Sequence, residues 1–104
     1  MEKYAWKAKV IEGKMDEYEK RHKNIWPEMK EALKSAGIRN YTIWAVDNEL
    51  FGYYECESVA HASLIQSQSE TVKKWDEYMS DILIMEKDPE TGAQPRMRNV
   101  FSFD

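Results

Sequence analysis

The sequence predicts an α+β domain of the ferredoxin-like type, in which a four-stranded antiparallel sheet carries its helices on one face. Segments that alternate polar and apolar residues are typical of half-buried strands, and they are separated by segments whose apolar residues recur every three or four positions, typical of helices. The order of these segments is β-α-β-β-α-β. A chain of 104 residues is also the right size for one domain spanning 1–104.

The first predicted strand covers residues 3–11. Tyr4, Trp6, Ala8 and Val10 fall on one of its faces, and lysines alternate with them on the other. This period of two indicates a strand with one buried face.

A helical pattern follows over residues 14–36. Proline lacks the N–H that a helix interior needs, so Pro27 predicts a kink or short break around residues 23–27. Asn24 is a plausible cap for the second piece, with Pro27 in its first turn. Gly37 is suited to end that piece.

Two strands are predicted over 38–46 and 50–57, which are rich in β-branched and aromatic residues. The residues between them, 47–49, are turn formers, so the pair is expected to be a hairpin.

The last third of the chain should contain the second helical region and the closing strand. Ser58 can cap a short helix over 59–66, and the run 67–70 fits a capping box for a longer helix over 69–84. A loop is expected at 88–92 and a final alternating strand at 97–103.

A sheet of this type leaves one face without helices, and aromatic residues occupy that face in either register. A small chain with an uncovered apolar sheet face usually pairs it with a second copy. We therefore expect a homodimer of the dimeric α/β-barrel type.

The composition excludes several classes of protein. The net charge is −4, with no basic stretch that would suit nucleic acid. Lys20, Arg21 and Lys23 alternate with glutamates and are interpreted as a solvated helix face. Cys56 is the only cysteine, so no internal disulfide or cysteine-based metal site can form. The sequence has no apolar leader or run of membrane-spanning length, and we expect a soluble cytoplasmic protein.

The strongest candidate for chemistry is His22. Tyr18 precedes it and Trp26 follows it by four residues, and such positions share a helix face. A phenol, an imidazole that titrates near neutral pH and a flat apolar ring suit a small polar ligand with an apolar face, such as a sugar. The competing interpretation is a histidine at a helix end, satisfied by water. Pro27 makes the Tyr18–His22 pair more secure than the relation to Trp26, which we interpret as packing.

Other candidates carry weaker signals. Tyr41 can present its hydroxyl, and Trp75 can stack on the apolar face of a pyranose, although both also suit a core. Asp76 follows at the edge of the same helical stripe. His61 has no aromatic or acidic partner at helical spacing and is expected on the surface, and Cys56 is expected to be a buried, inert thiol.

Taken together, these residues resemble the L-rhamnose mutarotases. The run RHKNIWPE at 21–28, with Tyr18 one turn upstream, is similar to the signature of that family. Asn-Tyr at 40–41, WDEYM at 75–79 and Val-Phe at 100–101 agree with it, so the resemblance spans nearly the whole chain.

The resemblance implies a dimeric ferredoxin-like enzyme without a cofactor that interconverts the α and β anomers of L-rhamnose. It implies that His22 is the proton donor and that Tyr18 and Tyr41 contact the substrate, as does a tryptophan pair matching Trp75 and the next position. Here that next residue is Asp76, so a related deoxysugar is an alternative substrate. Two other functions remain open: a cofactor-free monooxygenase on the same fold, and a non-catalytic ligand-binding module.

Overall fold

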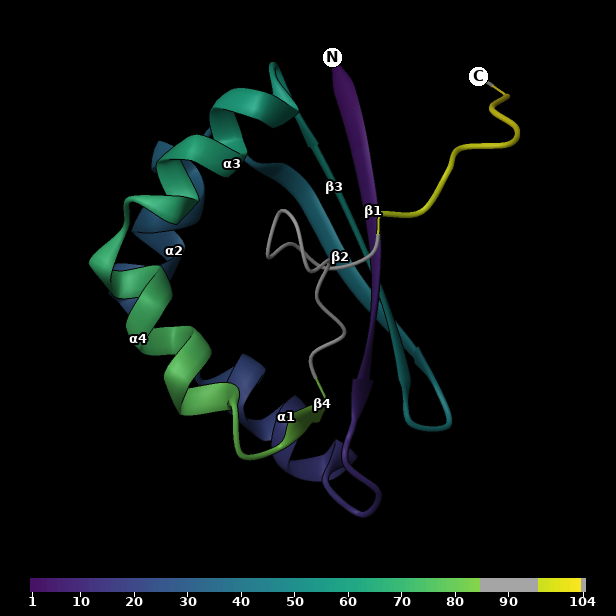
Figure 1. Ribbon diagram of the computed structural model, residues 1–104, viewed down its shortest axis with the longest axis vertical. Helices are drawn as coiled ribbons and strands as arrows, with labels where there is room; N and C mark the ends of the chain where they lie inside the picture. Colours follow the sequence, from purple (N-terminus) through teal and green to yellow (C-terminus); the bar gives the residue numbers. More distant parts are fainter. Residues whose placement is uncertain (85–95, 104) are drawn as a thin grey trace.

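The computed structural model describes residues 1–84 and 96–103. Its strands form one antiparallel sheet in the order β2-β3-β1-β4. All of its helices lie on one side of that sheet (Figure 1). The predicted ferredoxin-like α+β class is therefore confirmed. The predicted loop at 88–92 lies outside the described residues.

The order of the elements along the chain agrees with the prediction, and each helical region is split in two. The elements are β1 (Glu2–Val10), α1 (Met15–Lys23), α2 (Pro27–Ser35), β2 (Arg39–Val46), β3 (Glu49–Cys56), α3 (Val59–Ser67), α4 (Glu70–Met79) and β4 (Leu83–Ile84). No helix in the described part of the chain is long and apolar enough to cross a bilayer.

The predicted break beside His22 is confirmed, and its cause is Pro27. Trp26 adopts an extended backbone (φ −62°, ψ 139°), and Pro27 opens α2 as its first residue. The expectation that Asn24 caps α2 is wrong. Asn24 instead ends α1, where its side-chain Nδ2 donates to the Lys20 carbonyl at 2.9 Å. The chain thus leaves α1 at Asn24 and enters α2 at Pro27, with three residues between the two helices.

Serine side chains cap both later helices, largely as expected. The Ser58 hydroxyl accepts from the His61 amide and opens α3. For α4 the cap is Ser69, which accepts from the Val72 amide, rather than Ser67 of the proposed capping box.

The predicted helix over 69–84 is too long at its C-terminal end. It ends at Met79, because Leu83 and Ile84 pair with the edge of β1 opposite Val10 and Lys9. Leu83 and Ile84 also fit the helical pattern, but they pair with β1 because its edge has backbone groups that need hydrogen-bond partners.

The predicted strand at 97–103 is wrong as a strand of this sheet. Arg96 forms an isolated bridge to Trp6, and the Met97 amide donates to the Ala5 carbonyl at 2.7 Å. Beyond this point the chain leaves the edge of β1 (Figure 1). Its alternating pattern has no strand partner here, and Phe101 and Phe103 are 78 % and 88 % exposed.

The core lies between the helices and one face of the sheet. From the sheet it takes the even-numbered residues of β1 and β3, among them Ala8, Val10, Leu50 and Cys56. Trp6 belongs to the same face and lies against Gly52 on the neighbouring strand. A Cβ at Gly52 would come within 2.0 Å of the Trp6 ring, so only glycine leaves room for this indole.

The opposite face of the sheet carries large apolar side chains with no helix over them. Trp44 and Val46 on β2 are 68 % and 62 % exposed, and Phe51 and Tyr53 on β3 alternate with the core residues. We refer to this surface as the open face. The C-terminal segment forms one wall of a groove of about 550 Å³ beside it.

Candidate active site

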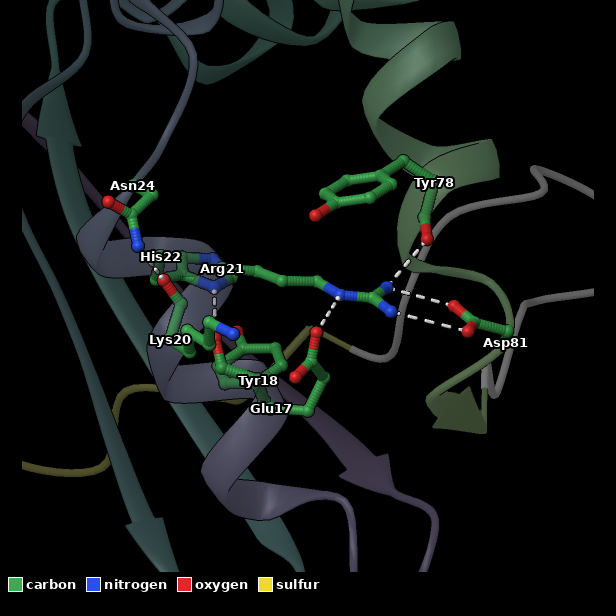
Figure 2. Close-up of polar contacts among 8 residues, drawn as sticks. All are labelled: Glu17, Tyr18, Lys20, Arg21, His22, Asn24, Tyr78 and Asp81. Carbon is green, nitrogen blue, oxygen red and sulfur yellow. Dashed lines mark hydrogen bonds and ion pairs between the residues drawn. The ribbon is translucent and has the colours of Figure 1, made fainter.

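The Tyr18–His22 pair forms as the helical spacing predicts. The two rings stack on the surface of α1 with centroids 4.3 Å apart and an angle of 29° between their planes (Figure 2). The Nδ1 atom of His22 lies 3.2 Å from the Tyr18 carbonyl oxygen. A carbonyl can only accept, so Nδ1 carries a proton in this contact. In the neutral imidazole this leaves Nε2 with its lone pair.

Two tryptophan rings form an aromatic wall beside His22. Trp75 on α4 meets the imidazole almost at right angles, with centroids 5.4 Å apart. Trp26, from the start of α2, meets Trp75 in the same manner at 5.0 Å. The break at Pro27 therefore removes Trp26 from the face of α1 and places its ring against Trp75. Trp26 is packing, as the sequence suggested, but it packs against a site residue.

This burial changes the acid–base properties of the imidazole. Removing the ring from water disfavours its charged form and lowers the pKa of His22 below the usual value of about 6.5. The hydrogen bond to the Tyr18 carbonyl opposes this shift to a smaller extent. At neutral pH the resting group is therefore the neutral imidazole, with Nε2 ready to accept a proton.

Tyr41 lies on β2, and its hydroxyl oxygen already accepts one hydrogen bond. The Nε1–H of Trp6 donates to the Tyr41 oxygen at 3.1 Å. Indole N–H is a donor only, so the hydroxyl must accept in this contact and its own proton stays free for another partner. Burial raises the pKa of Tyr41 and of Tyr18, which keeps both phenols neutral.

Two further tyrosines, which sequence reasoning did not select, join Tyr41. The Tyr54 ring lies 5.3 Å from that of Tyr41, and Tyr4 stacks on Tyr54 at 5.0 Å. Negative charge on Tyr18, Tyr54 or Tyr4 would raise the pKa of Tyr41 further, so the four phenols are electrostatic neighbours. The sequence contained only their strand alternation as a signal, and the pairing of β1 with β3 that joins Tyr4 to Tyr54 is not readable from it.

The structure brings together some of the predicted site residues and separates others. His22 contacts both Tyr18 and Trp75, and Tyr41 on β2 lies close enough to Tyr18 for a negative charge there to raise the pKa of Tyr41. Trp75 is only 6 % exposed, so it acts here chiefly as a wall beside His22.

Three further candidates differ in their exposure. Asp76 follows Trp75 on α4 and is exposed. His61 is exposed on α3, as expected, and Cys56 is fully buried, where burial raises the pKa of its thiol. Within the described residues, acidic, histidine and cysteine side chains do not gather in a group of three or more that could hold a metal ion.

Comparison with known proteins gives a consistent family. A family model described as L-rhamnose mutarotase matches residues 3–103. The chain is similar to the L-rhamnose mutarotase of Lachnoclostridium phytofermentans, with 39 % identity over an alignment of 107 positions that covers 100 % of both proteins. It is 41 % identical to that of Listeria monocytogenes over 85 residues, which cover 80 % of this chain and 81 % of the relative.

Solved structures agree at the level of the fold. The L-rhamnose mutarotase from Formosa agariphila superposes with a TM-score of 0.82 at 29 % identity, and all of both chains is covered. A type II polyketide cyclase, tetracenomycin F2 cyclase from Streptomyces glaucescens, has a TM-score of 0.71 at 9 % identity and covers 100 % of this chain and 98 % of its own. That second likeness concerns the fold alone.

The burial of His22 leads to a direct prediction. In an NMR titration of the free protein, the His22 ring should change protonation below pH 6.5, because its charged form is desolvated. Trp75→Leu, which thins the wall beside the imidazole, should move that midpoint upward. Trp44→Leu, a matched change on the open face, should leave it in place. A His22 midpoint above that of a free histidine would contradict the assignment.

Proposed function

The chain belongs to the L-rhamnose mutarotase family, and from this we propose that it interconverts the α and β anomers of L-rhamnose or a closely related deoxysugar. The reaction opens the pyranose ring to the aldehyde and recloses it on the other face. The observation that carries the mechanism is the half-buried imidazole of His22, stacked on Tyr18 with Nδ1 engaged and Nε2 available.

His22 serves both halves of the proton transfer in this proposal. Opening the ring removes a proton from the anomeric hydroxyl and adds one to the ring oxygen, and both oxygens are bonded to the same carbon. Nε2 takes the first proton, and the imidazolium so formed is the proton donor to the ring oxygen. The carbon–ring oxygen bond breaks as the anomeric oxygen becomes a carbonyl. Reclosure runs the same steps backwards, so no proton is gained or lost.

The low pKa of His22 favours this sequence. The neutral form predominates at rest and can accept, while the imidazolium formed in a poorly hydrated site is a stronger acid than a solvated one. A group that only donated would need to be charged before the sugar arrived, which the burial opposes.

The tyrosines bind and orient the sugar in this proposal. The Tyr41 hydroxyl donates its proton to a sugar oxygen while its own oxygen accepts the hydrogen bond from Trp6. The raised pKa of Tyr41 keeps it a neutral hydrogen-bond donor rather than a proton source. Tyr18 contributes its hydroxyl from beneath His22. Rings with polar tips suit a ligand that presents both C–H faces and hydroxyls.

Trp75 and Asp76 are proposed to set the preference among sugars. Trp75 offers the edge of an apolar wall beside His22, which suits the methyl group of a 6-deoxysugar. Asp76 follows on the same helix and has a carboxylate that can accept from a sugar hydroxyl. A related deoxysugar, or an aldose with a hydroxymethyl group in place of the C6 methyl, is therefore an alternative substrate.

A homodimer is also part of this proposal. Trp44 and Val46 on the open face, and Phe101 and Phe103 in the C-terminal segment, expose more apolar surface than a small monomer usually does. A second copy of the chain would cover both regions by a two-fold contact. We further propose a cytoplasmic location, which the free, buried Cys56 thiol suits.

The role of His22 is tested by the rate of anomer exchange, measured by saturation-transfer NMR on L-rhamnose with the uncatalysed rate subtracted at each pH. His22→Gln should lower kcat/KM by roughly 10²–10⁴-fold, the usual contribution of a positioned acid–base group. In the parent enzyme kcat/KM should rise with pH through the lowered pKa of His22 and level off by neutral pH. His61→Gln is the matched control and should retain full activity.

The direction in which activity changes with pH distinguishes a His22 that first accepts a proton from one that only donates. If His22 only donates, activity must instead fall as pH rises through the same pKa. If His22→Gln exchanges anomers as fast as the parent, the assignment of His22 is wrong.

The sugar preference is tested with a panel of aldoses that includes L-rhamnose, L-fucose and L-mannose, of which only L-mannose has a hydroxyl at C6. Asp76→Trp should shift the ratio of kcat/KM values toward the sugar with the more apolar C6 group, because a ring replaces a carboxylate. Asp76→Asn separates the effect of charge from that of shape. An unchanged ratio in both variants would remove Asp76 from the site.

The dimer is tested by light scattering after size exclusion. The parent should have about twice the 12.3 kDa mass of the chain. Trp44→Glu should shift the mass toward the monomer, because it places a charge on the open face. Leu64→Glu makes the same kind of change at an exposed position on α3 and should leave the mass unchanged. A parent that remains monomeric at tens of micromolar would overturn the proposal.

A further inference from the structure

Arg21 does not belong to a solvated helix face, as the alternating charges had suggested. Its side chain is only 12 % exposed, although it lies between Lys20 and His22 in a charged run. Figure 2 shows it extending from α1 across to the end of α4. The guanidinium leaves the solvent because carboxylates, a backbone carbonyl and a ring face are arranged there to fit its planar fork.

The guanidinium is held on all sides. Nε donates to Glu17 on α1 at 3.0 Å, and Nη1 donates to the Tyr78 carbonyl at 2.7 Å. Nη1 and Nη2 donate to the two carboxylate oxygens of Asp81 at 2.9 and 3.3 Å. The central carbon also lies 4.5 Å from the centre of the Tyr78 ring. We call this set the Arg21 clamp.

The clamp connects two elements at a point where the backbone needs a partner. Tyr78 lies in the last turn of α4, where carbonyls lack an intrahelical N–H. Asp81 follows in the turn toward β4. Arginine alone among side chains can bind a carboxylate in two places and a carbonyl at once while its plane rests on a ring.

The clamp lies beside the contact that buries the imidazole. His22 follows Arg21 on α1, and Trp75 precedes Tyr78 by one turn on α4. Tyr78 in turn touches the rings of both Trp75 and Trp26. The Arg21 clamp and the His22–Trp75 contact are thus adjacent links between the same two helices, and the separation fixed by one is imposed on the other.

We propose that Arg21 is a positioning residue of the active site, which holds α1 against α4 so that His22 keeps its place between Tyr18 and Trp75. This inference rests on the proposed catalytic role of His22. Arg21 need not touch the sugar in it. A displacement of about 1 Å at a reacting group can cost on the order of 10²-fold in rate, so a small shift of α1 would be felt in kcat.

The clamp is expected to contribute more to geometry than to stability. Asp81 and Glu17 are 66 % and 40 % exposed, and ion pairs with exposed partners contribute little to the free energy of unfolding. A merely structural arginine would therefore show a small loss of stability and an unchanged site in the molecules that remain folded.

The experiment compares Arg21→Met, Arg21→Lys and Asp81→Asn with the control Lys20→Met, which removes an exposed cation one residue away on the same helix. Two readouts are taken on the folded dimer or monomer as it is purified. One is kcat and KM for anomer exchange. The other is the position of the histidine ring resonances in protein labelled at histidine, because ring currents from Tyr18 and Trp75 make the His22 signals sensitive to their distance. His61, exposed on α3, serves as the internal reference.

Arg21→Met and Arg21→Lys should lower kcat by about ten- to a hundredfold with a smaller change in KM, since a lysine cannot reproduce the fork. The His22 resonances should move in both variants, and to a lesser extent in Asp81→Asn, while those of His61 and of the Lys20→Met protein stay in place. Asp81→Asn keeps an acceptor for the arginine and so folds if the methionine variant does not.

Unmoved His22 resonances with full kcat in folded Arg21→Lys would overturn the proposal. The two hypotheses separate cleanly. If the proposed function fails, His22→Gln loses no activity, yet the His22 resonances still respond to Arg21.

Discussion

The site depends on one turn of helix, the step from Tyr18 to His22. That turn stacks the two rings and brings Nδ1 to the Tyr18 carbonyl, and so it determines which nitrogen of the imidazole is available. The helix must also stop there. If it continued unbroken, Trp26 would follow His22 on the same face. Pro27 turns the chain instead, and Trp26 arrives from the start of α2 to support Trp75.

The features that sequence reasoning recovered are those with causes close in the chain. The break at Pro27, the cap at Ser58 and the stacked pair on α1 each follow from residues within one or two turns. The missed features depend on pairing over long separations. Whether 83–84 continues a helix or joins a sheet depends on the free edge of β1, and the hydrogen bond from Trp6 to Tyr41 spans 35 positions.

Arg21 shows a second limit of sequence reasoning, which concerns charged residues rather than strand pairing. Alternating lysines and glutamates usually indicate a solvated surface, and for its neighbour Lys20 that interpretation holds. Arg21 carries the same charge but points at a helix end 57 residues away in sequence. Likewise, the aromatic residues could be counted beforehand, but not divided between the wall beside His22, the tyrosine cluster and the open face. Their spatial grouping decided that division.

The fit of Trp6 over Gly52 also has a consequence for the history of the chain. The two positions share one volume, because any side chain at 52 would overlap the indole. Position 52 cannot change alone: a side chain there requires a smaller group at position 6, and the indole donor that occupies the Tyr41 oxygen is then lost. A substitution at position 52 should therefore be inherited together with one at position 6, and each such pair should change the hydrogen bonding of the Tyr41 hydroxyl.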